Sequence, residues 1–281
     1  MVSIEVASQA GACYGVERAL KMVKDAAEKG GEVQTLGPLI HNPIVVSDLE
    51  RHGVTVADDV EVATAPTVVI RSHGVVPTVV ERARERGLEV IDATCPYVKK
   101  VQHAAERLGR EGYRVIVVGE SGHPEVEGIL GHAQGAAVVG GVPDLDRVEL
   151  GRKVGVVVQT TQSRALLREV VAELSCRVED LRVLNTICEA TSERQAAAAE
   201  LAGRADAMVV IGGRNSANTT RLAEICAFAC ANTHHVERAD ELDPSWFTNV
   251  SLVGITAGAS TPAAQIELVR KQSERLCGAN L

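Results

Sequence analysis

Aromatic residues are scarce in this sequence: phenylalanine, tryptophan and tyrosine together make up 2% of its 281 residues, although 46% of the residues are hydrophobic. The interior must therefore be built mostly from alanine, valine, isoleucine and leucine, a composition that suits parallel strands covered by helices. A chain of this length exceeds what one small core needs, so we expect two or three α/β units.

Long apolar runs and an excess of positive charge are also missing. No apolar run approaches the roughly 18 residues of a membrane-spanning helix, and the N-terminal stretch MVSIEVASQAGACYG has no basic segment followed by an apolar core. The formal net charge of -8 disfavours broad binding to nucleic acids or anionic membranes, which require an extended basic surface. We expect a cytoplasmic protein without a cleaved leader, in which an anionic ligand would need a local site.

Seven cysteines are present without a secretory signal. This combination indicates a reducing compartment, where thiols are catalytic or metal-bound rather than paired in disulfides. Three of them, Cys13, Cys95 and Cys188, mark an internal repeat, because each follows a strand-like run and precedes a helix-like segment. They are 82 and 93 residues apart, and 93 more residues follow the last one. The repeat predicts three lobes, at residues 1–94, 95–187 and 188–281.

The agreement continues beyond each cysteine. The residues found 28 positions after the three cysteines are His41, His123 and Ser216, each near the start of another helical pattern. A later loop in each lobe, again after a strand-like run, contains His73, Thr160 and Ser260. Short apolar strands that alternate with helical periods indicate βα units on parallel sheets. The sequence therefore predicts three similar α/β lobes with mainly parallel sheets and pseudo-threefold symmetry.

The three repeat cysteines are expected at the carboxyl ends of strands, where open α/β sheets bind their ligands. Each also opens a helix, and a helix N-terminus favours negative charge, as metal ligation by a thiolate requires. Without a CxxC pair, a closed structural zinc site with four ligands fits poorly. The residues alone are compatible with two kinds of metal site. One is a catalytic zinc with three cysteine ligands and a vacant position, and the other is a 4Fe-4S cluster with one exchangeable iron.

The other cysteines lack this placement. Cys226 and Cys230 lie on a predicted helix with apolar residues at core spacing, and His234 and His235 follow closely. Ordinary packing and a second zinc site are the two interpretations of this group.

Polar side chains of the matched loops are expected to form a ring around the symmetry axis: His41, His73, His123, Thr160, Ser216, Asn218 and Ser260. Such donors at helix N-termini can bind phosphate, even though lysine and arginine are scarce in these loops. Glu125 is the only carboxylate in the ring, which makes it the leading candidate for a proton donor. Taken singly, several of these residues could merely cap helices. Capping does not explain three histidines at symmetric loop tips.

These residues stand in motifs that resemble, in order and over essentially the whole chain, the LytB family of 4-hydroxy-3-methylbut-2-enyl diphosphate reductases. The motifs are GACYGVERA, LIHNP, RSHG, DATCPYVKK, GESGHPEVEG, QTTQS, NTICEATSERQ, GGRNSANTTRL and AGASTP. The resemblance implies a trefoil of three α/β lobes around an oxygen-sensitive 4Fe-4S cluster, with ferredoxin or flavodoxin as electron donor. It also implies the last step of the non-mevalonate isoprenoid pathway, in which loss of the C4 hydroxyl as water gives isopentenyl and dimethylallyl diphosphate.

The resemblance also implies a role for each motif residue. Cys13, Cys95 and Cys188 would bind the cluster and leave one apical iron open to the substrate. The diphosphate would be bound by His41, His73, His123, Ser216, Asn218 and Ser260. Thr160 would hydrogen-bond near the substrate hydroxyl, Glu125 would deliver protons, and His123 would also take part in catalysis.

The chain departs from the family pattern at three positions. Ala12 stands in place of an aromatic residue, Glu189 in place of an aspartate, and Ala217 in place of a second serine. The first two bear on the surroundings of the cluster and the third on substrate binding. Two rival functions stay open: a hydro-lyase that uses the cluster only as a Lewis acid, and a cluster-bearing redox sensor that turns over no diphosphate.

Overall fold

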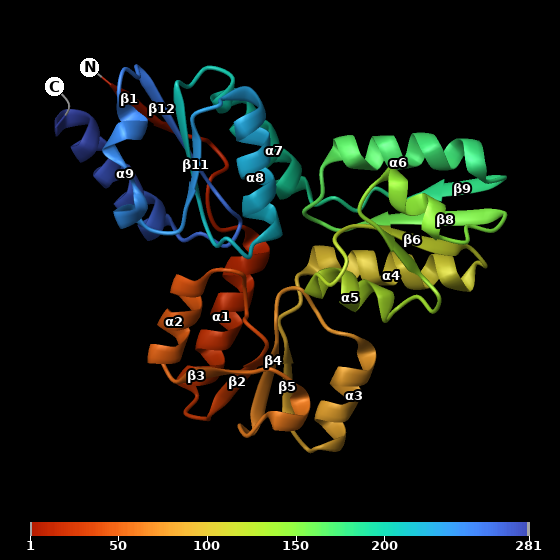
Figure 1. The fold of residues 1–281 in the computed structure, drawn as a ribbon. Coiled ribbons are helices and arrows are strands. Elements are labelled where there is room, and N and C mark those ends of the chain that lie inside the picture. Colours follow the sequence, from red (N-terminus) through yellow and green to blue (C-terminus); the bar gives the residue numbers. More distant parts are fainter. Residues whose placement is uncertain (1, 280–281) are drawn as a thin grey trace. The chain divides into compact units, whose positions relative to one another are not determined.

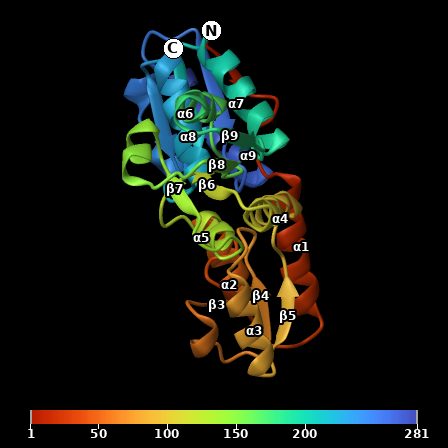
Figure 2. The ribbon, with the colours of Figure 1, turned by 90° about the vertical axis from the view of Figure 1, so that its right-hand side faces the viewer.

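The computed structural model describes residues 2–279, and within them it contains three four-stranded sheets whose strand pairs are all parallel. The first sheet, in the order β3-β2-β4-β5, comprises β2 (Val33–Leu36), β3 (Val54–Ala57), β4 (Thr67–Ile70) and β5 (Glu89–Asp92). Figure 2 shows β4 and β5 of this sheet side by side.

The other two sheets repeat this order. The second, β7-β6-β8-β9, comprises β6 (Arg114–Val118), β7 (Ala137–Val139), β8 (Lys153–Val158) and β9 (Asp180–Val183). The third, β11-β10-β12-β1, comprises β10 (Ala207–Ile211), β11 (Thr233–Val236), β12 (Leu252–Ala257) and β1 (Ser3–Val6). The predicted fold class, three similar α/β lobes with parallel sheets, is confirmed.

The first strand lies in a different lobe from the one that the sequence suggests. β1, which precedes Cys13, pairs with β12 of the last lobe (Figure 1) rather than with strands of residues 1–94. In the other two lobes the strand at this edge, β5 or β9, is the last of its own lobe and precedes Cys95 or Cys188. The structural repeat thus ends at each cysteine, and the first strand completes the last lobe. As domain limits, 1–94, 95–187 and 188–281 stay a prediction.

The helices connect the strands and cover both faces of the sheets. They are α1 (Tyr14–Glu28), α2 (Pro43–Arg51), α3 (Pro77–Glu85), α4 (Pro96–Arg110), α5 (Pro124–Leu130), α6 (Arg164–Arg177), α7 (Glu189–Ala202), α8 (Ala217–Ala229) and α9 (Ala263–Ala279). Several begin with proline, whose fixed φ and missing N–H suit the first helical position. Every helix among the described residues is too short or too polar to span a lipid bilayer.

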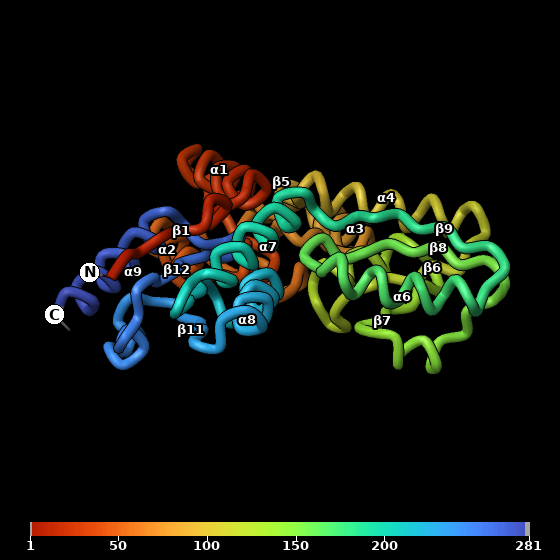
Figure 3. The backbone as a smooth tube through the Cα atoms, turned by 90° about the horizontal axis from the view of Figure 1, so that it is seen from above, coloured from red at the N-terminus to blue at the C-terminus, as the bar shows by residue number. Residues whose placement is uncertain are grey.

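The second lobe shows how the aliphatic core is built. Successive side chains of β6 point to opposite faces, as the pleat of a strand requires. Ile116 packs in one cluster with Leu174 of α6, and Val117 packs in another with Leu108 of α4. Figure 3 shows α6 and α4 on opposite sides of β6 and β8. The sheet is therefore buried on both faces, which explains its continuous valine-rich strands.

The chain divides into two compact units. The first unit consists of the described parts of Met1–Tyr14, His41–Val45 and Glu189–Leu281, and it contains the third sheet. The second unit consists of Gly15–Ile40 and Val46–Cys188, and it contains the first and second sheets.

In two lobes, a glycine in an inner strand of the sheet allows close packing of the helix that follows the repeat cysteine. A Cβ at Gly155 in β8 would lie 2.9 Å from both Cδ atoms of Leu108 in α4. A Cβ at Gly254 in β12 would likewise lie 2.9 Å from Cγ of Leu201 in α7. Each leucine stands 13 residues after its cysteine. The close approach of helix to sheet is therefore a repeated feature of these two lobes.

We predict that Gly155→Ala lowers the free energy of unfolding by about 1–3 kcal/mol, because the added methyl group overpacks the contact with Leu108. Gly109→Ala on α4 is the control, since a Cβ there meets no atom within 4 Å. It should raise the free energy of unfolding by about 0.5–1 kcal/mol. Denaturant unfolding measures both. A Gly155→Ala protein as stable as the natural one would show that the contact is not tight.

Candidate functional site

Each lobe holds its repeat cysteine by the same backbone hydrogen bond. The cysteine N–H donates to the carbonyl oxygen two residues after the end of the neighbouring strand, which is β12, β4 or β8. The bonds join Cys13 to Ala259 at 3.1 Å, Cys95 to Ser72 at 2.9 Å and Cys188 to Thr160 at 3.0 Å. The helices α1, α4 and α7 begin at the next residue. The three cysteines therefore occupy equivalent places in their lobes.

The connections that lead to these cysteines differ in length. Residues 93–94 separate β5 from Cys95, residues 184–187 separate β9 from Cys188, and residues 7–12 separate β1 from Cys13. All three side chains are half-buried. The shared hydrogen bond thus brings connections of two, four and six residues to one position at the sheet edge.

The predicted equivalence of His41, His123 and Ser216 also holds in the lobes, since each stands five residues after the end of β2, β6 or β10. Ser216 caps α8 by accepting the N–H of Thr219 at 3.4 Å, which confirms its interpretation as a cap. His123 is a cap as well, because its Nδ1 accepts the N–H of Glu125 at 3.1 Å. The sequence did not indicate this role. With Nδ1 as acceptor, the neutral ring carries its proton on Nε2.

The loops after β4, β8 and β12 correspond residue for residue, but the predicted match of Thr160 with His73 and Ser260 is displaced by one position. His73 and Ser260 stand three residues after their strands, whereas Thr160 stands two residues after β8. Thr161 is therefore the positional equivalent of His73 and Ser260, and Thr160 is the residue whose carbonyl receives Cys188. The motif QTTQS contains two adjacent threonines, so the sequence alone could not settle which one matched.

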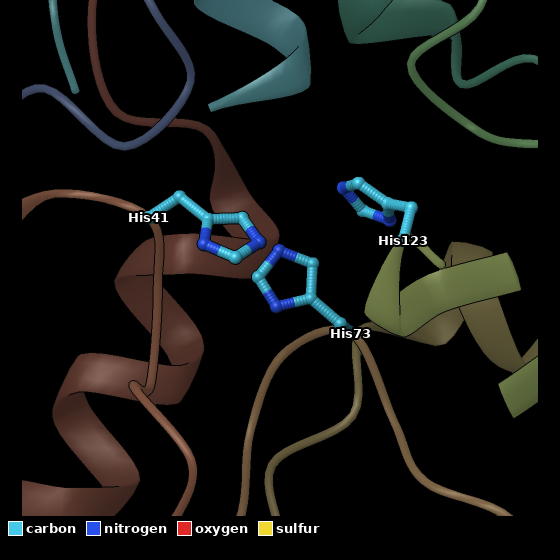
Figure 4. A group of neighbouring side chains, drawn as sticks. All are labelled: His41, His73 and His123. Atoms are coloured by element: carbon cyan, nitrogen blue, oxygen red, sulfur yellow. The ribbon is translucent and has the colours of Figure 1, made fainter. Parts of the chain in front are cut away.

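Two predicted diphosphate ligands lie side by side in the second unit. The rings of His73 and His123 have centroids 5.6 Å apart and cross at 79°. Figure 4 labels both side chains. His73 comes from the loop after β4, and His123 comes from the N-terminus of α5, so they belong to different lobes. Figure 4 also labels His41, which belongs to the first unit.

Glu125 is the buried carboxylate of residues 2–279, with 2% of its surface exposed. One carboxylate oxygen accepts the N–H of Thr160 at 2.6 Å, and the other accepts the Thr160 hydroxyl at 2.7 Å. Burial raises the pKa of Glu125 to about 7, although the hydrogen bonds from Thr160 act in the opposite direction. Glu120 adds a smaller upward contribution. Glu125 can therefore gain and lose a proton near neutral pH.

Asn218 is a predicted ligand in the first unit with unmet hydrogen-bonding capacity. It lies in the first turn of α8 and has 4% of its surface exposed. Neither the nitrogen nor the oxygen of its amide has a hydrogen-bond partner among the described residues. A buried amide without partners is costly, so this position fits a polar ligand that supplies them.

Asn42 positions Ser260, and the sequence did not single it out. The amide nitrogen of Asn42 donates to the Ser260 carbonyl at 2.9 Å and to the side-chain oxygen of Gln265 at 3.0 Å. Its amide oxygen accepts two N–H groups of the first turn of α2. A Cβ on Gly213 would lie only 2.5 Å from the carbonyl oxygen of His41. An asparagine before proline is a helix-start signal, so the motif LIHNP contained the necessary hint.

Cys226 and Cys230 are core residues. Burial raises the pKa of Cys226 to about 12, with a further contribution from Cys230, so the thiol keeps its proton. The His234 ring stacks on Trp246 with a centroid distance of 3.8 Å. Within residues 2–279, these cysteines and the neighbouring histidines do not form a group that could hold a metal ion. The packing interpretation is confirmed.

The raised pKa of Glu125 predicts a specific pH dependence of stability. Its folded pKa of about 7 lies above the ordinary glutamate value of 4.5, so its stabilising contribution is complete below pH 4.5 and is lost as the pH rises through 7. Relative to Glu125→Gln, the natural protein should lose up to about 3 kcal/mol of unfolding free energy between pH 4.5 and 8. Denaturant unfolding at several pH values measures this difference. Glu127→Gln, exposed on the same helix, should follow the natural protein, and identical pH profiles for all three would contradict the prediction.

Comparison with known proteins places the sequence among closely similar chains. The family model described as LytB protein matches residues 4–274. A curated protein of Geobacter sulfurreducens is 52% identical over 269 residues, which cover 95% of each chain. One of Aquifex aeolicus is 46% identical and covers 100% of this chain and 99% of its own. Both are named 4-hydroxy-3-methylbut-2-enyl diphosphate reductase.

Solved structures agree with this relationship. One, of an (E)-4-hydroxy-3-methyl-but-2-enyl diphosphate reductase described as the terminal enzyme of the non-mevalonate pathway, has 46% identity and a TM-score of 0.72. It covers 98% of this chain and 100% of its own. The Plasmodium falciparum reductase has 27% identity and a TM-score of 0.89, covering 94% of this chain and 85% of its own. The chain belongs to the LytB protein family.

Proposed function

We propose that this chain is a reductase that converts 4-hydroxy-3-methylbut-2-enyl diphosphate into isopentenyl and dimethylallyl diphosphate. Family membership and the names of relatives about half identical over nearly the whole length support this assignment. The observation that carries it is the double role of Thr160. Its N–H and hydroxyl hold the carboxylate of Glu125, and its carbonyl holds the N–H of Cys188. A proton source and a candidate ligand of an electron-transferring group are thus joined through one residue.

A 4Fe-4S cluster fits the residues that this chain offers. Cys13, Cys95 and Cys188 are present as thiols at equivalent sheet edges, and each opens a helix whose N-terminus favours negative charge. Three thiolate donors would leave one iron of such a cluster with an exchangeable position. When bound, the cluster supplies electrons and an electrophilic iron. We assign ferredoxin or flavodoxin as the donor of these electrons. We also assign the protein to the cytoplasm, because a reducing compartment suits a chain with seven cysteine thiols.

The diphosphate group is assigned to the polar residues of the loop tips, His41, His73, His123, Ser216, Asn218 and Ser260. The ring pair of His73 and His123 offers N–H donors from two lobes. The amide of Asn218 has a donor that a phosphate oxygen would satisfy. Charge-assisted hydrogen bonds of this kind contribute about 1.5–3 kcal/mol each. Several together can hold a diphosphate without lysine or arginine.

We assign the role of proton donor to Glu125. Reductive loss of the hydroxyl consumes two electrons and two protons, breaks the C–O bond and releases the oxygen as water. A carboxyl with a pKa of about 7 is partly protonated at neutral pH, so it can donate a proton to the reacting substrate. The two hydrogen bonds from Thr160 then stabilise the carboxylate that remains. Thr160 orients the donor and moderates its pKa.

Turnover under anaerobic conditions with a chemical reductant tests the function and the role of Glu125 together. The natural chain should form both products. Glu125→Gln should lose at least about 10²-fold in kcat, the usual scale for a general acid, with KM little changed. The exposed neighbour variant Glu127→Gln should remain close to the natural chain. No turnover by the natural chain would refute the function, and a nearly normal kcat for Glu125→Gln would refute its role.

The ligand assignment is tested by iron content. Cys95→Ser should lose most of its iron and its visible absorption, because a serine hydroxyl is a harder and poorer ligand for an iron–sulfur cluster than a thiolate. Cys13→Ser and Cys188→Ser should behave in the same way. Cys176→Ser is the control, since this cysteine is exposed on α6. A normal cluster in any one of the three repeat variants would show that the assigned ligand set is wrong.

A further inference from the structure

Arg194 is one of two charged residues buried in the described part of the chain, the other being Glu125. It lies on α7 with 4% of its surface exposed, on the same helix face as the buried residues Thr191, Ala198 and Leu201. Burying a guanidinium group is unfavourable unless its donors are satisfied. A charge at a core position of a helix therefore requires a specific reason.

The guanidinium group of Arg194 holds the segment that leads to Cys13. Its Nη2 donates to the carbonyl oxygen of Gly11 at 2.8 Å, in a buried contact between residues 183 positions apart in sequence. Its Nη1 donates to the carbonyl oxygen of Ala190 at 3.1 Å, in the first turn of α7. Gly11 is two residues before Cys13. Arg194 thus ties the Cys13 segment to the beginning of the helix that follows Cys188.

The Cys13 segment needs such a tether more than its counterparts do. It has six residues between strand and cysteine, whereas the counterparts of Cys95 and Cys188 have two and four. A longer connection has more conformational entropy to lose when it is ordered. Gly11 also has φ +108°, and a Cβ there would lie 3.0 Å from Cδ1 of Ile266. Two bonds from outside the segment hold this conformation: the Gly11 N–H donates to the Ala257 carbonyl at 3.4 Å, and the shorter bond, from Arg194, fixes the Gly11 carbonyl.

We propose that Arg194 is a positioning residue for Cys13 that also places a fixed positive charge near this proposed cluster ligand. The proposal rests on the proposed function for its redox part, but the tether follows from the contacts alone. Arginine stays charged at all accessible pH values. Because reduction makes a cluster more negative, a nearby fixed positive charge favours the reduced state.

The tether is tested on the full chain after anaerobic removal of metal. The rate of alkylation of Cys13 by iodoacetamide is measured by mass spectrometry, with Cys95 of the same molecule as internal reference. Arg194→Gln should raise the ratio of the Cys13 rate to the Cys95 rate about tenfold, and Arg194→Lys should raise it severalfold because it cannot make both hydrogen bonds in the same geometry. Arg204→Gln, which removes an exposed arginine paired with Glu5 of β1, is the matched control and should leave the ratio unchanged.

The charge is tested on the cluster-loaded chain without substrate, by the ratio of reduced to oxidised cluster at a fixed solution potential. Arg194→Gln should lower this ratio about tenfold, which corresponds to 59 mV for one electron. Arg194→Lys keeps the charge and should stay within about threefold of the natural chain. A purely structural role would shift this ratio in both variants, because both weaken the tether, whereas a role of the charge spares Arg194→Lys.

The proposal is overturned if Arg194→Gln equals Arg204→Gln in both measurements. If Arg194→Gln fails to fold, the alkylation ratio of Arg194→Lys decides, and an unchanged ratio overturns the tether. Equal ratios of reduced to oxidised cluster in Arg194→Gln and Arg194→Lys overturn the role of the charge. A natural chain that binds no iron would count against the proposed function and the redox part, while the alkylation result would still decide the tether.

Discussion

The backbone hydrogen bond that holds each repeat cysteine is the constraint on which the rest of the site depends. It fixes the residue directly before a helix against the carbonyl two positions beyond a neighbouring strand. In a parallel sheet this is the edge at which the loops and helix N-termini gather, and ligands bind there. Connections of two, four and six residues all satisfy the same bond. The lobes can therefore differ in loop sequence without displacing the thiol.

Opposing effects on one carboxyl group give the site its acid–base chemistry. Burial alone would push the pKa of Glu125 upward, and the two hydrogen bonds from Thr160 alone would lower it. Together they leave a group that exchanges its proton near neutral pH. Because the carbonyl of the same threonine receives Cys188, the proton chemistry is built on the strand end that also positions a cysteine.

The two buried charged residues of the described chain each contact a segment that positions a repeat cysteine. Glu125 contacts a loop residue that holds Cys188, and Arg194 contacts the segment that leads to Cys13. Elsewhere the buried residues are uncharged and mostly aliphatic, and Cys226 and Cys230, outside the repeat, pack in this core. The unfavourable free energy of burying a charge therefore arises next to the loops that hold the proposed cluster ligands.

The sequence by itself determined the three lobes, the parallel sheets and the family, because strand–cysteine–helix segments recur and their motifs are local. It also indicated that Glu125 is exceptional. Only the tertiary structure decided that β1 completes the last sheet, that Thr160 rather than Thr161 meets Glu125, and that Asn42 and Arg194 hold functional segments. These features are contacts between residues distant in sequence, some of them more than 180 positions apart. Local periodicity cannot encode such pairings, since they depend on which strand edges and helix faces meet when the core is buried.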